Sequence, residues 1–232
     1  MPDHIFRQFD AELESVRSRV LQMGGMVEQQ IMRAIEALIS GDMELMDRVI
    51  ADDHRVNALE VGLDESCSQV IARRQPAAGD LRLLITVIKT ITDLERIGDE
   101  AEKIARMAKL IHGADRVNMP RIDLSHVADH ALAMLRQALD SFARLDVSEA
   151  MRVVKQDQAV DDEFRGIMRQ LITFMMEDPR TISRSLEILF IAKAVERIGD
   201  HAKNMAEYVI YMAKGRDVRH VSLEQIEKEL LE

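Results

Sequence analysis

The sequence of 232 residues has no tryptophan, and aromatic side chains of all kinds make up only 3% of it. Four prolines and ten glycines give the chain few positions that break a helix or make a tight turn. Residues with high helix propensity (alanine, leucine, methionine, glutamate, arginine and lysine) are abundant. The composition therefore predicts an all-α protein with few turns.

Cysteine is nearly absent, because Cys67 is the single one in the sequence. An intrachain disulfide is impossible, which is typical of proteins from a reducing compartment. Cys67 also falls on an apolar helical face. We therefore interpret it as a small buried hydrophobic residue.

Excess positive charge is lacking as well, since the formal net charge is −10. Nucleic acids favour positively charged surfaces, so we expect no nucleic-acid partner. No stretch reaches the roughly 18–20 apolar residues that span a bilayer, and residues 83–91 are interrupted by Thr86 and Lys89. The first residues carry neither a basic segment nor an apolar segment of a secretory signal. We expect a cytoplasmic protein without direct membrane insertion, although binding to a membrane complex stays open.

Sequence signatures of catalysis are also missing. No glycine-rich phosphate loop, G-x-S-x-G or H-E-x-x-H occurs. Ferritin-like di-iron enzymes need Glu-x-x-His on two helices, and the nearest matches here begin with aspartate, at Asp123 and Asp217. The sequence thus predicts that the protein is not an enzyme.

The most informative feature is a pentad, Glu-Arg-Ile-Gly-Asp, that occurs at residues 95–99 and again at 196–200. The two copies begin 101 residues apart. Upstream, matches such as Asp53 with Asp157 continue at an offset of 104. A period of about 100 residues is too long for a solenoid unit. It predicts two copies of a small domain.

Apolar periodicity and its breaks predict six helices, at about 9–39, 43–74, 81–111, 123–146, 147–177 and 183–214. We expect the third helix to begin after an N-cap at Asp80. Long helices joined by tight turns run antiparallel and bury apolar stripes. We therefore predict two tandem three-helix bundles, at 1–113 and 123–215, with a linker at 114–122. We expect residues 216–232 to form a tail with a short helix that starts near Ser222. A single six-helix bundle is the alternative.

Acidic residues interrupt the apolar stripes of four predicted helices. In the first repeat they are Asp53, Glu95 and Asp99, joined by Asn57; in the second they are Asp157, Asp161, Glu196 and Asp200. Buried carboxylates need neutralisation, pairing or a metal ion. Oxygen ligands favour hard cations such as Mg²⁺, Mn²⁺ or Ca²⁺, and iron also binds carboxylates. A salt-bridged or exposed acidic face is the competing interpretation.

Glycines and basic residues beside these carboxylates bear on that choice. A glycine within a helix costs about 1 kcal/mol relative to alanine, so Gly98 and Gly199 indicate close approach of a neighbouring helix or of a bound ion. Lys103 could pair with Asp99 at i+4, but Asn204 replaces it in the second copy. Arg96 and its counterpart in the second pentad suit solvent or partners on their own helix.

The histidines are weaker signals. His126 and His130 are four residues apart and could chelate a metal, but two ligands do not make a site, so we expect a solvated or core role. His54 and His201 follow Asp53 and Asp200 directly and could support the carboxylates. We expect both of them at the surface.

Several motifs together resemble the PhoU family, the accessory proteins of phosphate-specific transport systems. They cover nearly the whole chain: Phe-Asp-Ala-Glu-Leu-Glu at 9–14, Met-Gly-Gly-Met-Val-Glu at 23–28, Arg-Gln-Pro at 74–76 with Asp-Leu-Arg at 80–82, both pentads, and Met-Met-Glu-Asp at 175–178. The resemblance looks closest to proteobacterial members.

The resemblance implies tandem three-helix bundles that often form homodimers. It implies a cytoplasmic negative regulator of phosphate transport and of the phosphate-starvation response, an adaptor between the phosphate ABC transporter ATPase and the phosphate-sensing histidine kinase. It also implies metal binding (Mg, Mn, Fe or Zn) at Glu95/Asp99, Glu196/Asp200 and Asp157/Asp161. The equivalent pair of the first bundle is Asp53/Asn57, where asparagine departs from the all-acidic pattern. A carboxylate-bridged metalloenzyme and a metal-storage bundle are the alternatives.

Overall fold

The computed structural model describes residues 2–113, 122–219, 221 and 225. Within these residues the secondary structure is entirely helical. The elements are α1 (Pro2–Ser40), α2 (Met43–Arg74), α3 (Ala78–His112), α4 (Ser125–Arg144), α5 (Val147–Glu177), the 3₁₀ helix η1 (Pro179–Thr181) and α6 (Ile182–Lys214). The prediction of an all-α fold is confirmed. Most of the predicted linker and of the predicted helix near Ser222 lie outside the described residues.

Repeated caps define where the second helix of each repeat begins. Asp42 accepts a hydrogen bond from the amide of Leu45 at 3.0 Å, and Asp146 accepts one from Glu149 at the same distance. Each carboxylate satisfies an amide that has no partner within its own helix. These two aspartates stand 104 residues apart, so the sequence repeat is also a repeat of local structure. The predicted cap at Asp80 is wrong, because α3 already begins at Ala78 and Asp80 lies in its first turn.

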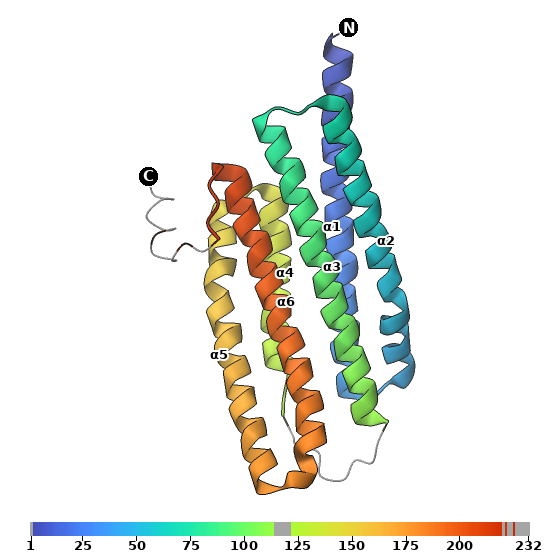
Figure 1. Ribbon diagram of the computed structural model, residues 1–232, viewed down its shortest axis with the longest axis vertical. Helices are drawn as coiled ribbons and strands as arrows, with labels where there is room; N and C mark the ends of the chain where they lie inside the picture. The colour runs from blue at the N-terminus through green and yellow to red at the C-terminus, as the bar shows by residue number, and fades with distance from the viewer. Residues whose placement is uncertain (1, 114–121, 220, 222–224, 226–232) are drawn as a thin grey trace.

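Each repeat forms a three-helix bundle, and the two bundles lie side by side. α1, α2 and α3 pack together, as do α4, α5 and α6, while α3 also packs along α6 and α1 packs along α4. Figure 1 shows α3 and α6 in the centre, with α2 and α5 on the outer edges. The predicted tandem bundles are therefore present, joined along an extensive common surface.

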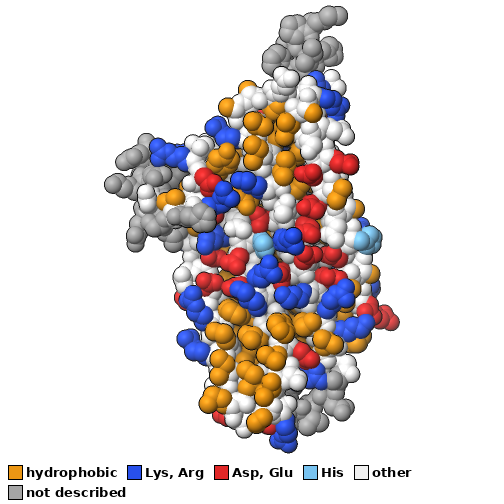
Figure 2. Space-filling view, viewed as in Figure 1, with side chains coloured by type: hydrophobic (Ala, Val, Ile, Leu, Met, Phe, Trp, Pro, Cys, Tyr) orange, Lys and Arg blue, Asp and Glu red, His pale blue; other side chains and the backbone are white. Residues whose placement is uncertain are grey.

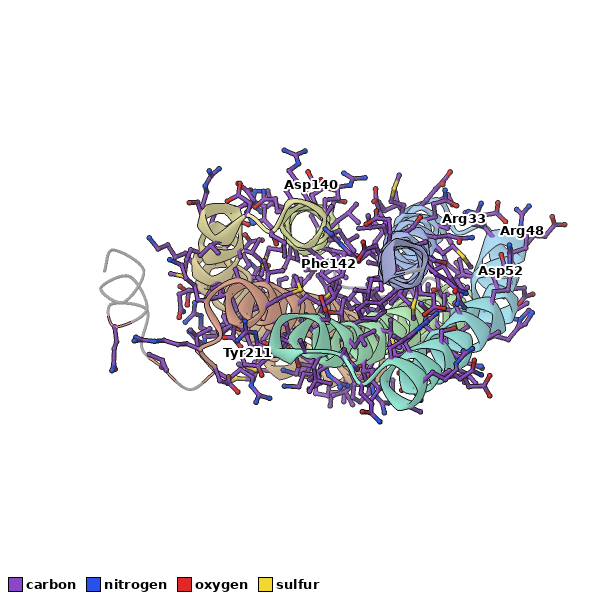
Figure 3. All side chains as sticks on the ribbon, turned by 90° about the horizontal axis from the view of Figure 1, so that it is seen from above. Arg33, Arg48, Asp52, Asp140, Phe142 and Tyr211 are labelled. Carbon is purple, nitrogen blue, oxygen red and sulfur yellow. The ribbon has the colours of Figure 1, made fainter. Side chains whose placement is uncertain are left out.

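Buried side chains of both bundles form one continuous core. Phe142 of α4 points inward and is almost completely buried, whereas Asp140 points away from the bundle (Figure 3). Cys67 is fully buried, and burial raises the pKa of its thiol to about 11. A protonated, inaccessible thiol fits the predicted role as a small core residue.

Polar contacts fix the direction of α3 relative to α6. The Arg197 guanidinium of α6 forms an ion pair with Glu100 of α3. One turn further along α6, His201 Nδ1 lies 2.6 Å from Asp93 Oδ1, which is further back along α3. As the residue number rises on one helix it falls on the other, so the two helices run antiparallel.

No helix among the described residues combines the length and the apolar character that crossing a membrane requires.

The contact between α1 and α4 gives a test of the packing between bundles. A Cβ atom added at Gly24 would lie 2.4 and 2.7 Å from the two methyls of Leu139 and 3.2 Å from its branch carbon. The adjacent Gly25 has no atom within 4 Å of such a Cβ. We expect Gly24→Ala to lower the free energy of unfolding by about 1–3 kcal/mol through overpacking. Gly25→Ala, the matched control, should raise it by about 1 kcal/mol through helix propensity.

Denaturant unfolding of the two variants measures this difference directly. Equal stabilisation by both substitutions would show that α1 and α4 do not approach each other closely at Gly24.

Candidate functional site

The predicted residues of the first repeat lie on α2 and α3, and we call Asp53, Asn57, Glu95 and Asp99 the first acidic cluster. Asp53 is buried, and the Asn57 amide donates to its Oδ2 at 3.1 Å. Glu95 and Asp99 lie one turn apart on α3 and are partly buried. Burial is the main cause that raises the pKa of both carboxyls, followed by Asp99 for Glu95 and by Asp53 for Asp99. The structure thus brings these carboxylates within electrostatic reach of one another.

A residue from the third helix of the bundle joins this cluster. Gln30 of α1 is buried, and its Nε2 donates to Asp53 Oδ1 at 3.0 Å. Its carbonyl oxygen and that of Asn57 are buried without a hydrogen-bond partner among the described residues. Two unsatisfied carbonyl oxygens beside a carboxylate are costly unless water, another donor or a cation approaches them.

This donor set fits a hard divalent cation. Carboxylate and amide oxygens are the ligands that such cations prefer. Gln30, Asn57 and Asp53 would supply them from two helices, with Glu95 and Asp99 adding charge from the third. His54 is exposed, as expected, and hydrogen-bonds the carbonyl of Ala51. His201 was expected at the surface, and that expectation is wrong: its side chain is only 15% exposed, because it faces Asp93 of α3.

Basic side chains also contact the first cluster. Arg96 lies 3.5 Å from Glu95 and 3.3 Å from Asp99, with just over half of its side chain exposed. Such exposed ion pairs contribute little to stability. Lys103 was expected to pair with Asp99, but its Nζ pairs with Glu100 instead, at 3.3 Å. Ion pairing at the first cluster is therefore mainly through Arg96, a long side chain that is more than half exposed.

The second acidic cluster consists of Asp157 and Asp161 on α5 with Glu196 and Asp200 on α6. Asp157 and Glu196 are buried, and lysines pair with both: Lys203 with Asp157 at 2.7 Å, and Lys193 with Glu196. Burial, Glu196 and Asp157 together raise the pKa of Asp200 to about 6. Four carboxylates thus converge here, partly neutralised by lysine.

The two clusters differ at one equivalent position. The offset of 104 places Met134 of α4 where α1 has Gln30. A Cβ added at Gly98 would lie 3.3 Å from Gln30 Oε1, whereas one added at Gly199 would lie 3.8 Å from the sulfur of Met134. Both glycines therefore allow side chains of a neighbouring helix to approach closely, which is one of the two explanations that the sequence offered for them. Only the first cluster adds an amide there.

Both clusters lie at the middle of the molecule. Figure 2 shows a band of charged side chains across this height, over α5, α6 and α3, with apolar side chains gathered above and below it. Arg197 of the second pentad forms an ion pair with Glu100, which directly follows the first pentad. Arg197 was expected to face solvent or its own helix, and that expectation is wrong because α3 packs directly against α6.

Sequence reasoning missed two residues that the structure places near candidate ligands. Gln30 is one, and a polar residue on the otherwise apolar stripe of α1 could have indicated it. Glu163 of α5 is the other, since it contacts both His126 and His130. Neither contact follows from spacing within a single helix.

The fold and the clusters define a class: an all-helical protein of two repeats, each with a carboxylate cluster on its second and third helices. The PhoU domain model matches residues 20–108 and 124–209. The chain is 49% identical over 229 residues to the phosphate-specific transport system accessory protein PhoU of Serratia marcescens, covering 98% of this chain and 93% of that one. The chain therefore belongs to the PhoU family.

Further relatives agree. The PhoU protein of Escherichia coli K12 is 48% identical, with 97% of this chain and 93% of that protein covered. The crystal structure of PhoU from Pseudomonas aeruginosa matches with a TM-score of 0.86 at 47% identity, over 90% of this chain and 100% of that chain. That of the phosphate transport system regulatory protein PhoU from Streptococcus pneumoniae matches at 0.84 and 27% identity, covering 90% and 99%.

The raised pKa of Asp200 predicts a pH dependence of stability in protein freed of metal. Folding moves this pKa from its ordinary value of 3.8 to about 6, so the folded state holds the proton more tightly than the unfolded state. The resulting stability is present below the ordinary value and is lost as pH rises through about 6. We expect wild type to lose stability relative to Asp200→Asn across this window.

Thermal melts of both proteins in chelator at a series of pH values test this, with Asp140→Asn on the exposed side of α4 as the control. A constant difference between wild type and Asp200→Asn across the window would contradict the convergence of carboxylates at Asp200.

Proposed function

We propose that this chain is a cytoplasmic, non-enzymatic adaptor that regulates phosphate transport. It binds the ATPase of the phosphate ABC transporter and the phosphate-sensing histidine kinase, and it holds the phosphate-starvation response off when phosphate is plentiful. The observation that carries this proposal is the 49% identity, over 98% of this chain, to a protein named phosphate-specific transport system accessory protein PhoU.

The surface supports a role in binding proteins. Large apolar side chains are exposed near the end of the molecule where η1 joins α5 to α6: Ile172, Met176, Ile182, Leu186 and Phe190. Figure 2 shows apolar side chains gathered there, below the charged band. Clustered exposed apolar groups mark interaction sites, and the charged band beside them favours a partner with complementary charge.

Metal binding at the acidic clusters is part of the proposal. The first cluster offers unsatisfied amide oxygens next to carboxylates, and the second offers four carboxylates. A cation of the Mg²⁺, Mn²⁺, iron or Zn²⁺ class, when bound, supplies positive charge at an otherwise acidic surface. The carboxylates of each cluster would hold the cation, and its charge would offset the repulsion between them.

A pull-down against the purified ATPase and the kinase, with and without Mn²⁺, tests the adaptor role. We expect wild type to bind both proteins, and Leu186→Asp with Phe190→Asp to reduce binding about tenfold or more by placing charge in an apolar contact. Arg144→Ala, an exposed change on α4, is the control. The adaptor proposal fails if wild type binds neither protein under any metal condition.

The difference between Gln30 and Met134 allows the first cluster to be tested separately. We expect Gln30→Leu to weaken Mn²⁺ binding about tenfold, because it removes a ligand or a group that positions Asp53. Met134→Leu, a substitution of similar volume at the equivalent position of the second repeat, should leave Mn²⁺ binding unchanged. Calorimetric titration of the metal-free chains provides both affinities. Equal affinities in the two variants and wild type would remove Gln30 from the site.

A further inference from the structure

Two histidines and a glutamate meet on the outer side of the second bundle. His126 and His130 lie in the first turns of α4, and Glu163 lies on α5, 37 residues after His126. We call these three residues the His–Glu trio. Their ligand atoms, one from each side chain, all lie within 4.8 Å of one another.

The carboxylate of Glu163 is shared between the two rings. His126 Nδ1 lies 2.9 Å from Glu163 Oε2, and His130 Nδ1 lies 2.6 Å from Glu163 Oε1. The ring centroids are 4.2 Å apart, because residues one helical turn apart stand above each other. Both Nδ1 atoms therefore already face the same carboxylate.

The trio is separate from the second acidic cluster, although Glu163 is close to Asp161 in sequence. Two residues along a helix correspond to a rotation of about 200°, so these two side chains leave α5 on opposite sides. Asp161 contributes to the field at Asp200 of α6, whereas Glu163 contacts α4. A ligand at the trio would bridge α4 and α5 and leave α6 untouched.

The electrostatic surroundings favour a cation. Asp123 and Asp129 place further negative charge near His126, beside the carboxylate of Glu163 that contacts it. About three quarters of the His126 side chain is exposed, so water can reach the trio. An approaching cation would therefore meet negative charge from several sides.

The donor set identifies the class of cation. Two histidines and one glutamate are a known protein ligand set for zinc, in which water fills the fourth position. Bonds of about 2.0–2.1 Å place the ligands of a tetrahedral zinc ion about 3.3 Å apart. The nitrogen–oxygen distances in the trio are slightly shorter than this. The three ligand atoms lie within 4.8 Å of one another, so rotation of the side chains would have to bring them to equal spacing around the ion.

A purely structural ion pair would need only one of the histidines. Exposed ion pairs contribute little to stability, so a second ring on the same carboxylate adds little as a brace. As a chelate, in contrast, each additional ligand strengthens metal binding. We propose that His126, His130 and Glu163 bind a divalent cation of the zinc class, which clamps α4 to α5 in the second repeat.

Calorimetric zinc titration of the metal-free full-length chain, of two trio variants and of one control variant tests the proposal. We expect His126→Ala and Glu163→Gln each to weaken one zinc site about tenfold or more. His54→Ala removes an exposed histidine of α2 that hydrogen-bonds only its own helix among the described residues, and it should leave that site unchanged. Unchanged zinc affinity in both trio variants would overturn the proposal.

A second readout distinguishes this site from the acidic clusters. In wild type, zinc should shift the imidazole nitrogen resonances of His126 and His130 in NMR spectra. The shift should persist in a chain carrying Asp53→Asn, Asp99→Asn, Asp157→Asn and Asp200→Asn. Loss of the shift in that chain would place zinc at the carboxylate clusters instead. Thermal melts of the trio variants that match wild type verify that they fold.

Discussion

The antiparallel packing of α3 against α6 is the constraint on which the rest of the structure depends. It joins two bundles into one continuous core, and it brings the duplicated pentads to the same height. The ion pair of Arg197 with Glu100 and the contact of His201 with Asp93 lie on this surface. Because both are polar and partly or fully buried, they are satisfied in only one register. Sliding α3 along α6 would leave these charges unpaired.

Local patterns in the sequence predicted much of this structure, and contacts between distant segments account for the rest. The six helices, the repeat and the convergence of Asp53 with Asp99 follow from periodicity, because each depends on which residues share a helical face. Gln30 and Glu163 join their sites from a helix other than the one that carries the motif. Arg197 was misassigned for the same reason, since its partner lies on the other bundle. Spacing within one helix holds no information about these pairings.

The two acidic clusters solve one electrostatic problem in different ways. Lysines neutralise buried Asp157 and Glu196 in the second repeat, while the first repeat gives Asp53 two amide donors and leaves two amide oxygens unsatisfied. An amide carries no charge, so it stabilises a carboxylate without competing against a cation. A metal ion that enters the second cluster must displace the lysines or bind beside them. Their positive charge weakens the attraction of the carboxylates for the ion. The first cluster, despite having fewer carboxylates, presents the less obstructed set of oxygen ligands.

This difference bears on how metal binding at each cluster would act in the proposed adaptor. A rigid bundle transmits a change only if a ligand favours one of two arrangements, and its differential affinity sets how far the equilibrium can shift. Lys193 and Lys203 belong to α6 and pair with Glu196 and Asp157, the carboxylates that a cation would bind. Metal binding at the second cluster would therefore release positive charge onto the charged band. At the first cluster the basic side chain in contact is Arg96, whose exposed ion pairs contribute little, so a cation there would act mainly through local rigidity and charge.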